Sequence, residues 1–252
     1  MKRTVLGMAV LLVGVVWLIF AFRGGSWLGH NNERLNLSAE GIVTLDISTS
    51  AGSLIIKGDD RADEIVAIAD IRRPFLANKG SVKFSLERDG KTARLVSDLR
   101  PSFGIWGSSI DITVTVPSSM NIVLKDGSGN LEMSDIAGEV EIEDGSGNMR
   151  LIELGNIRKI RDGSGNLLLR NTGGNLVLID QSGSIEVDGH EGDLDITDGS
   201  GDLTVRGLKG NLVLEDGSGD VHVRGVEGNV TVKNDGSGSL SVDEVNGTYT
   251  KP

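Results

Sequence analysis

Asp126-Gly-Ser-Gly129 is the first copy of the short phrase that decides the fold of this chain. The phrase returns further along the chain, beginning at Asp144, Asp162, Asp198, Asp216 and Asp235. A variant, Asp180-Gln-Ser-Gly183, fills the remaining place, and every step is 18 residues except a last step of 19. A repeat this regular predicts a stack of equal supersecondary units, one for each copy.

A finer step of about nine residues lies within each repeat. It carries an apolar residue at Leu131, Val140, Met149, Ile157, Leu167, Leu176, Ile185, Leu194, Leu203, Leu212, Val221, Val230, Leu240 and Tyr249. A second apolar residue usually follows two places later, on the same side of a strand. Each repeat therefore predicts a coil of two short strands with inward apolar pairs. The step slips near Ile157 and gains one residue near Asn234.

Short strands of this kind cannot bury their inner faces alone, so the coils must stack. Stacking at about 4.8 Å would give parallel sheets around one apolar interior. The sequence therefore predicts an all-β fold, a parallel β-solenoid with about 18 residues per coil. A hexapeptide solenoid does not fit, because Leu203 is followed six places later by Lys209. The Gly-Gly-x-Gly-x-Asp pattern of a calcium β-roll is also missing.

The two corners of a coil carry different residues. Asp-Gly-Ser-Gly suits a tight corner, because glycine reaches positive φ and Asp and Ser side chains bond backbone N–H groups. The column beside it predicts a ladder of stacked side chains: Asn130, Asn148, Asn166, Ser184, Asp202, Asp220 and Ser239. The other corner has a mostly apolar column that predicts an inward side chain: Ile136, Leu154, Thr172, His190, Leu208, Val226 and Val245.

Calcium is the alternative explanation for the aspartate column. Asp198 and Asp202, and again Asp216 and Asp220, place two carboxylates around each Ser hydroxyl, and calcium prefers such oxygen donors. Most other coils carry Asn or Ser in place of the second Asp, and no Glu completes a bidentate site. Structural turns are therefore favoured, with no metal and no cofactor. Thermal stability with calcium and with a chelator distinguishes the two readings.

The N-terminal segment has the pattern of a membrane anchor. Lys2 and Arg3 precede an apolar run from Val5 to Phe22, which as a helix spans about 27 Å. We predict a cytoplasmic stub and transmembrane signal-anchor over residues 1–23 and a tether over residues 24–38. The charges at the start place the rest of the chain in the periplasm or outside the cell. The alternative is a cleaved signal peptide and a secreted protein.

Residues 39–120 are predicted to form an N-terminal β part that caps the regular solenoid of residues 121–252. Apolar and polar residues alternate in several stretches, and Asp89-Gly90 between two of them predicts a hairpin. A loop rich in Pro, Ser and Gly carries three large apolar residues, Phe103, Ile105 and Trp106. This loop is either a lid on the end of the stack or a tip that binds a partner.

Composition and charge exclude several functions. The net charge of −11 and the pI of about 4.8 argue against nucleic acid as a partner. The chain has no Cys, and its three histidines, His30, His190 and His222, do not share a predicted face. The outward carboxylates Glu132 and Glu186 are three coils apart, roughly 14 Å, which is too far for an acid–base pair. These features indicate a protein that is not an enzyme.

These residues also resemble a known family. Val43-Thr-Leu-Asp-Ile47, Gly52-Ser-Leu-Ile-Ile-Lys-Gly58, Ile112-Thr-Val-Thr-Val-Pro117 and the serial Gly-Ser-Gly-Asn/Asp-Leu coils resemble the bacterial putative-adhesin family, whose β-strand-repeat domains have no known function. The resemblance covers roughly residues 40–250. It implies a right-handed parallel β-solenoid, often membrane-tethered or exported, with some members similar to components of envelope-stress operons. The resemblance implies no catalytic residues, because the family pattern contains none. Many members of the family have Thr at the position equivalent to Asp126.

Together these features predict a membrane-anchored, extracytoplasmic β-solenoid that works as an adhesin-like binding or scaffold module. The partner would be a protein or a surface polymer, and the sequence leaves the oligomeric state open. The main alternative is a regulatory or sensory protein of the envelope-stress response that binds a membrane partner. A more distant alternative is a carbohydrate-active β-helix enzyme.

Overall fold

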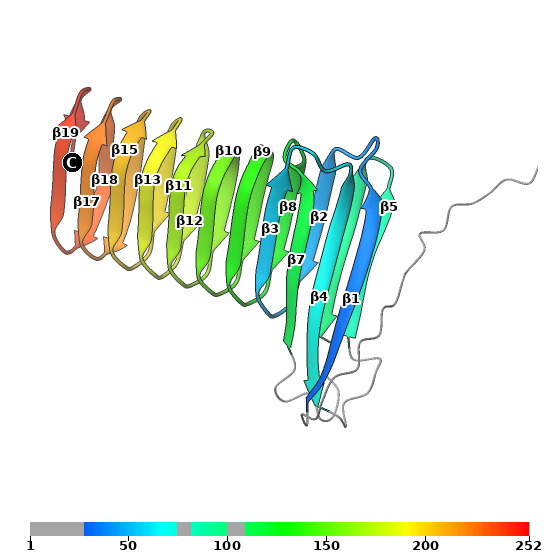
Figure 1. Ribbon diagram of the computed structural model, residues 1–252. Coiled ribbons are helices and arrows are strands. Elements are labelled where there is room, and N and C mark those ends of the chain that lie inside the picture. Colours follow the sequence, from blue (N-terminus) through cyan, green and yellow to red (C-terminus); the bar gives the residue numbers. More distant parts are fainter. Residues whose placement is uncertain (1–27, 75–81, 100–108, 252) are drawn as a thin grey trace, which may run out of the picture.

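The computed structural model describes residues 28–74, 82–99 and 109–251, which form only strands, turns and irregular segments. Within these ranges no helix is long and apolar enough to cross a membrane. The strands wind into the predicted parallel β-solenoid, with about seven coils of about 18 residues each. The coils stand side by side in one long row (Figure 1).

Two predicted features lie outside the described residues. They are the signal-anchor of residues 1–23 and the loop with Phe103, Ile105 and Trp106. Both stay predictions.

Twenty strands make up the described part of the chain. In order they are β1 (Leu28–Ser38), β2 (Thr44–Thr49), β3 (Leu54–Asp59), β4 (Glu64–Pro74), β5 (Val82–Asp89), β6 (Thr92–Leu99), β7 (Ser109–Pro117), β8 (Asn121–Asp126), β9 (Leu131–Asp144), β10 (Met149–Asp162), β11 (Leu167–Gly173), β12 (Leu176–Asp180), β13 (Ile185–Glu191), β14 (Leu194–Asp198), β15 (Leu203–Lys209), β16 (Leu212–Ser218), β17 (Val221–Val226), β18 (Val230–Ser237), β19 (Leu240–Val245) and β20 (Tyr249–Thr250).

The coils build two parallel ladders with the core between them. One ladder runs through β6, β2, β8, the second halves of β9 and β10, and then β12, β14, β16, β18 and β20. The other runs through β7, β3, the first halves of β9 and β10, and then β11, β13, β15, β17 and β19. Leu167 pairs with Ile185 and Ile185 with Leu203, so equivalent residues stack directly.

The predicted apolar pairs form a continuous core. Leu203 and Val205 are fully buried in β15, whereas Thr204 between them points outward and is half-buried. The column at the second corner is also buried from Ile136 to Val226, as its apolar character predicts. One cluster of buried side chains extends through the stack, and this continuity holds the coils together.

Both predicted irregularities are present. The register between β9 and β10 shifts between Leu154 and Asn156 and shifts back between Ile157 and Lys159, so the slip in the nine-residue step is compensated within the pair. The pairing of β16 with β18 shifts at Glu215, which pairs with Asn234, the place of the extra residue. Each bulge absorbs one residue, so the inward face is restored in the next turn.

The N-terminal strands do not follow chain order. The coil formed by β2 and β3 lies between two others, because β6 and β7 pair on one side of it and β8 and β9 on the other. β5 and β6 form the antiparallel hairpin predicted at Asp89-Gly90. β4 runs antiparallel to β7 and carries β1 on its outer edge.

Part of the expected tether is a strand. Residues 28–38 form β1, which pairs with β4 over its whole length. Leu35 and Leu37 pack against the core, while Arg34, Asn36 and Ser38 face outward. The alternation in Arg34-Leu-Asn-Leu-Ser38 is typical of a strand. The stretch is short and follows a polar segment, so the sequence alone favours a tether there.

The glycine corners explain why the coils approach so closely. Gly147 has a φ of 138°, and a Cβ there would lie 1.6 Å from the carbonyl oxygen of Gly129 in the neighbouring coil. The predicted side-chain ladder beside this corner takes a different form. The N–H of Asn148 donates to Oδ1 of Asn130 at 3.2 Å, and the N–H of Asn166 to Oδ1 of Asn148 at 3.1 Å. The ladder therefore joins side chains to backbone rather than amide to amide.

Candidate binding groove

Each coil bends at the residue just before the inward column of the second corner. The backbone there has a positive φ, between 50° and 75°, in seven consecutive coils. Three coils place glycine at the bend: Gly189, Gly207 and Gly225. Four place a larger polar residue there: Asp135, Glu153, Asn171 and Glu244. A left-handed backbone costs a non-glycine residue roughly 1–2 kcal/mol, somewhat less for Asn and Asp. These four residues therefore occupy a position where glycine would adopt the backbone conformation at a lower energetic cost.

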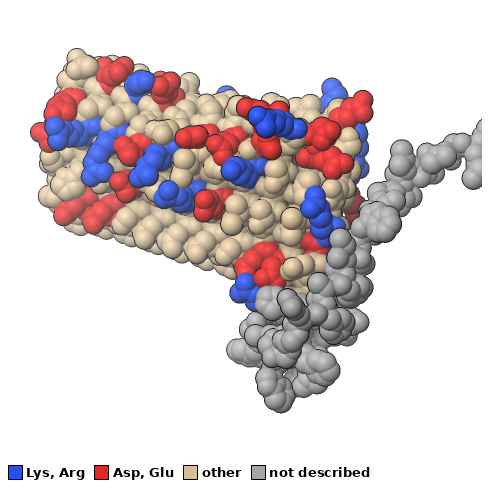
Figure 2. Space-filling model, in the orientation of Figure 1, with Lys and Arg blue, Asp and Glu red and all other residues tan. Residues whose placement is uncertain are grey.

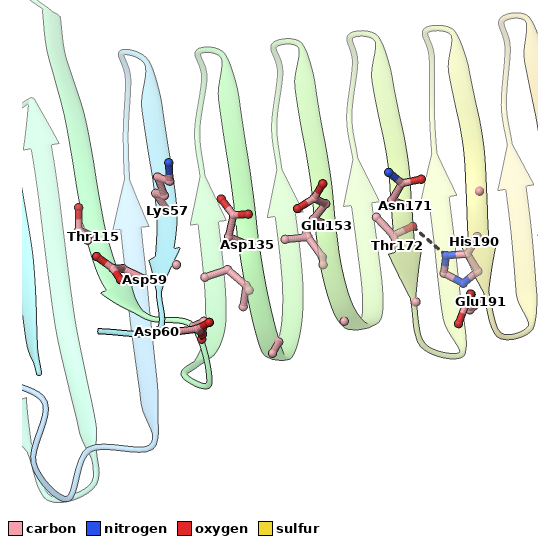
Figure 3. A pocket seen from close by; sticks show the side chains of 18 of the residues that line it. Lys57, Asp59, Asp60, Thr115, Asp135, Glu153, Asn171, Thr172, His190 and Glu191 are labelled. Atoms are coloured by element: carbon pink, nitrogen blue, oxygen red, sulfur yellow. Dashed lines mark hydrogen bonds between the residues drawn. The ribbon is translucent and has the colours of Figure 1, made fainter. Parts of the chain in front are cut away.

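A groove of about 1340 Å³ runs beside this bend across five coils of the repeat and extends to residues of β3 and β7. Figure 3 shows Asp135, Glu153 and Asn171 in a row on neighbouring coils, all pointing the same way. Two places further along each coil, the column is Ala137, Gly155 and Gly173, so no bulky side chain fills the groove there. The groove is thus a channel along the solenoid axis, with polar groups at each coil step of about 4.8 Å.

Charged groups mark both ends of the groove. At one end, Asp59 accepts a hydrogen bond from the backbone N–H of Arg61 at 2.9 Å, and Asp60 accepts one from the Ser118 hydroxyl. At the other end, Glu191 forms an ion pair with Lys209 of the next coil. The Lys209 ammonium holds the pKa of Glu191 below its usual value, so this carboxylate stays ionised. Figure 2 shows acidic and basic side chains interspersed over the coils.

His190 lies beneath the groove surface rather than in it. Its side chain is fully buried. The Nε2–H donates to the carbonyl oxygen of Gly174 at 2.8 Å, and the Thr172 hydroxyl donates to Nδ1 at 2.9 Å (Figure 3). Burial lowers the pKa of His190 and favours the neutral ring. Because both ring nitrogens already have partners, His190 is a structural residue and offers no base to a ligand.

The exposed part of the groove offers hydrogen-bond acceptors. Asp135 is half-buried and accepts a hydrogen bond from the Ser134 hydroxyl at 2.8 Å. Glu153 is exposed and has no partner among the described residues. A carboxylate can only accept hydrogen bonds, so Asp135 and Glu153 suit a ligand that presents hydroxyl or ammonium groups. Aromatic side chains other than His190 are absent from the described lining.

The four carboxylates considered for calcium do not share a site. Asp198 and Asp216 point into the solenoid and are 3% and 1% exposed. Asp202 and Asp220 lie on the outer surface, where Asp202 accepts the N–H of Asp220 at 3.2 Å. Over the described residues, no group of three or more acidic or histidine side chains could hold a metal ion. The inward direction of the Asp column is a finding that the turn pattern alone did not give.

Sequence reasoning missed Asp135, Glu153 and Asn171, although a signal existed. Their positions are taken by glycine in the next three coils, at Gly189 and the equivalent positions after it. A column that alternates between Gly and Asp, Glu or Asn indicates a positive φ. That bend turns these side chains toward the groove.

A comparison with protein-family models assigns the chain to a family. The model described as Toastrack DUF4097 matches residues 70–251. The chain belongs to the Toastrack family. This confirms the family resemblance, since the solved relatives include proteins named as putative adhesins. None of the curated proteins matches the chain.

Three solved structures are similar to this chain to different degrees. A "putative adhesin" from Parabacteroides distasonis is 12% identical with a TM-score of 0.51, covering 88% of this chain and 96% of its own. Another from Bacteroides fragilis is 16% identical with a TM-score of 0.47, covering 87% and 96%. A "putative lipid binding protein" from Parabacteroides distasonis is 15% identical with a TM-score of 0.37, covering 88% and 97%. At these identities, the first likeness shows the fold alone.

Proposed function

We propose that this protein is a non-enzymatic, membrane-anchored, extracytoplasmic binding module of the adhesin type, and that it binds its ligand along the groove. The observation that carries the proposal is the row of Asp135, Glu153 and Asn171, kept on a strained backbone along an open channel. Strained residues persist where the surrounding fold enforces them, and they cluster at functional sites. The solenoid supplies that rigid support.

The ligand is an extended polymer that presents ammonium or hydroxyl groups. The groove crosses five coils, so a polymer can contact equivalent groups at successive coil steps. Its acceptors favour donor-bearing ligands, and because the described lining of the groove has no Phe, Tyr or Trp, hydrogen bonding is more important there than ring stacking. A cationic polymer gains most, because charge-assisted hydrogen bonds are roughly twice as strong as neutral ones.

Glucosamine polysaccharides in their acetylated and deacetylated forms test this role. Calorimetry on the full chain should show tighter binding of the deacetylated, cationic form. Glu153→Gln should weaken it about 5–10-fold, because the amide keeps the shape but removes the charge. Glu132→Gln, which removes an exposed carboxylate outside the groove, is the matched control and should bind like the wild type. Equal binding by all three proteins would overturn the groove as the site.

One observation favours an enzyme as a second candidate. Asp135 and Glu153 occupy the same position on adjacent coils, whose backbones are about 4.8 Å apart, and a spacing of this order can bring two carboxyl groups to the about 5–5.5 Å found in retaining glycosidases. However, a general acid in these enzymes is protected from water, whereas Glu153 is exposed. Turnover of a polysaccharide panel that disappears in both Asp135→Asn and Glu153→Gln would establish the enzyme. Binding without turnover supports the binding module.

A further inference from the structure

A column of polar side chains runs through the apolar interior of the solenoid. Six aspartates, each the first residue of its corner phrase, are between 1% and 6% exposed: Asp126, Asp144, Asp162, Asp180, Asp198 and Asp216. Each one pairs in register with the aspartate of the next coil. Six carboxyl groups therefore stack inside the protein, at a coil spacing of about 4.8 Å.

Most of their oxygen atoms have no partner. The turns supply some donors, as where the N–H of Ser164 donates to Asp162 Oδ1 at 3.1 Å. The buried oxygens without a hydrogen bond of good geometry are Oδ2 of Asp126, Asp162 and Asp180, and both side-chain oxygens of Asp144, Asp198 and Asp216. The backbone N–H groups of the two residues after Asp144, Asp198 and Asp216 lie near these carboxyl groups and lower their pKa, but burial has the larger effect. Buried polar atoms without partners are rare in proteins and need a physical explanation.

Among the residues that the structure describes, no other charged group faces the aspartate column between its two ends. The inward neighbours two residues earlier are apolar and buried: Leu124, Ile142, Ile160, Leu178, Ile196 and Leu214. The first inward residues of the facing strands are apolar too: Leu131, Met149, Leu167, Ile185, Leu203 and Val221. The residues just before each aspartate, including Lys125, Glu143, Arg161 and Glu215, alternate to the outer side. The charged groups facing each aspartate are therefore the aspartates above and below it.

The two ends of the column differ. At one end, the Thr49 hydroxyl bonds to Asp126, and Ser97, the partner of Thr49 in the next rung, continues the column. At the other end, Asp235 pairs with Asp216 and forms an ion pair with Lys251. The column thus starts with neutral hydroxyls and ends at a surface cation.

We infer that the six buried aspartates form a proton-filled ladder, in which each protonated carboxyl group donates an O–H···O hydrogen bond to the next. The shared protons satisfy the orphaned oxygens and remove the repulsion between stacked carboxylates. The solenoid therefore takes up protons as it folds and becomes less stable as the pH rises through neutrality.

Burial acts on the carboxyl groups in the same direction. It raises the pKa of Asp144 and of Asp198 to about 7, with help from the neighbouring carboxylates, and that of Asp162 to about 6. It also raises the pKa of Asp126, Asp180 and Asp216. A carboxyl group with a raised folded pKa stabilises the fold fully below its unfolded pKa of about 4. That stability is lost as the pH rises toward 7.

A cation is the competing occupant, and the geometry disfavours it. A cation between two coils would contact the carboxyl groups of only two aspartates, whereas calcium takes six to eight oxygen ligands. The surrounding side chains are aliphatic and supply none. A proton needs only the two oxygens that it joins.

The experiment melts the full chain in detergent at pH 5 and pH 8, followed by circular dichroism. The wild type should lose roughly 5–10 °C at pH 8. Asp144→Asn with Asp198→Asn should lose clearly less, since the amides are neutral at both pH values. Asp202→Asn with Asp220→Asn changes the outer carboxylates of the same corners and should behave like the wild type. His190 titrates in the opposite sense, but it is unchanged in all three proteins.

Infrared spectroscopy of the wild type keeps the test independent of whether a variant folds. Protonated carboxylic acids have a carbonyl band apart from the amide bands, and it should be present at pH 5 and fade around pH 6–7, far above the usual carboxyl pKa. A band that disappears near pH 4 would overturn the inference. So would a melting temperature at pH 8 that calcium restores to its pH 5 value and a chelator lowers again.

Discussion

At the scale of single residues, two kinds of glycine hold the coils and they differ in what surrounds them. Gly147 combines a positive φ with a backbone of the neighbouring coil that leaves no room for a Cβ, whereas at Gly207 a Cβ would make only an ordinary van der Waals contact, 3.7 Å from the backbone N of Gly189. At Gly147 both a steric clash and the backbone conformation disfavour a larger residue, whereas at Gly207 only the backbone conformation does.

A pair of alanine substitutions separates these two limits. Gly207→Ala should cost about 1–2 kcal/mol of unfolding free energy, from the left-handed backbone only. Gly147→Ala should cost roughly 3 kcal/mol or more, because its Cβ meets a carbonyl oxygen that cannot move without shifting the neighbouring coil. Urea unfolding measures both. Equal losses would mean that the coils do not approach each other at the Asp-Gly-Ser-Gly corner as described.

The residue scale also predicts a gain. Glu153→Gly should relieve left-handed strain and stabilise the protein by up to about 1 kcal/mol, while abolishing its contribution to the groove. Urea unfolding and calorimetry with the deacetylated polysaccharide measure the two effects on the same sample. A variant that is both less stable and fully able to bind would contradict the role given to this residue.

At the scale of the element, the coil is the unit of construction. Each coil contacts its neighbours through in-register ladders and stacked inward pairs, so the stack has no fixed length. Removing residues 185–202 deletes one 18-residue coil. In the shortened chain Leu203 takes the place of Ile185 and pairs with Leu167.

The deletion should therefore leave a folded solenoid with similar circular dichroism and a modestly lower melting temperature. Removing residues 185–201 instead leaves one residue too many, which the stack can accommodate only by a new bulge like the one at Asn234, so this variant should have a clearly lower melting temperature than the 18-residue deletion. Size-exclusion chromatography and circular dichroism distinguish these outcomes. Similar behaviour of the two deletions would argue against a strict coil register.

The elements also show what the sequence could predict. The step of nine, the inward pairs and the apolar second corner were readable, because burial against the next coil enforces the same residue type in each repeat. The inward aspartates were not recognised, although Ile122, Leu124 and Asp126 alternate onto one side of β8. Hydrogen bonding within a turn already explains a polar residue at a corner. The sequence therefore provided no reason to expect these aspartates to be buried, and only the structure shows it. The groove could not be predicted from the sequence, because it depends on the positive φ at the bend, which the residue types only suggest.

At the scale of the whole molecule, the solenoid combines a rigid interior with an adaptable exterior. The apolar pairs and the aspartate column lie inside, and the corners and the groove can change from coil to coil without disturbing them. A solved structure that is only 12% identical to this chain has a similar fold, consistent with stacking that depends on the pattern rather than on particular side chains. Function is then a property of a few exposed columns, such as the one at Asp135 and Glu153.

Cross-linking between coils tests this architecture most directly, and the natural chain has no cysteine to interfere. Thr204 and His222 are paired on adjacent coils, at a spacing within the range of a disulfide. Thr204→Cys combined with His222→Cys should form an intramolecular disulfide on mild oxidation, seen by mass spectrometry of the digested protein. Thr204→Cys with Val213→Cys, on the other ladder, should keep both thiols free. Free thiols in the first pair, or a bridge in the second, would contradict the stacked-coil account.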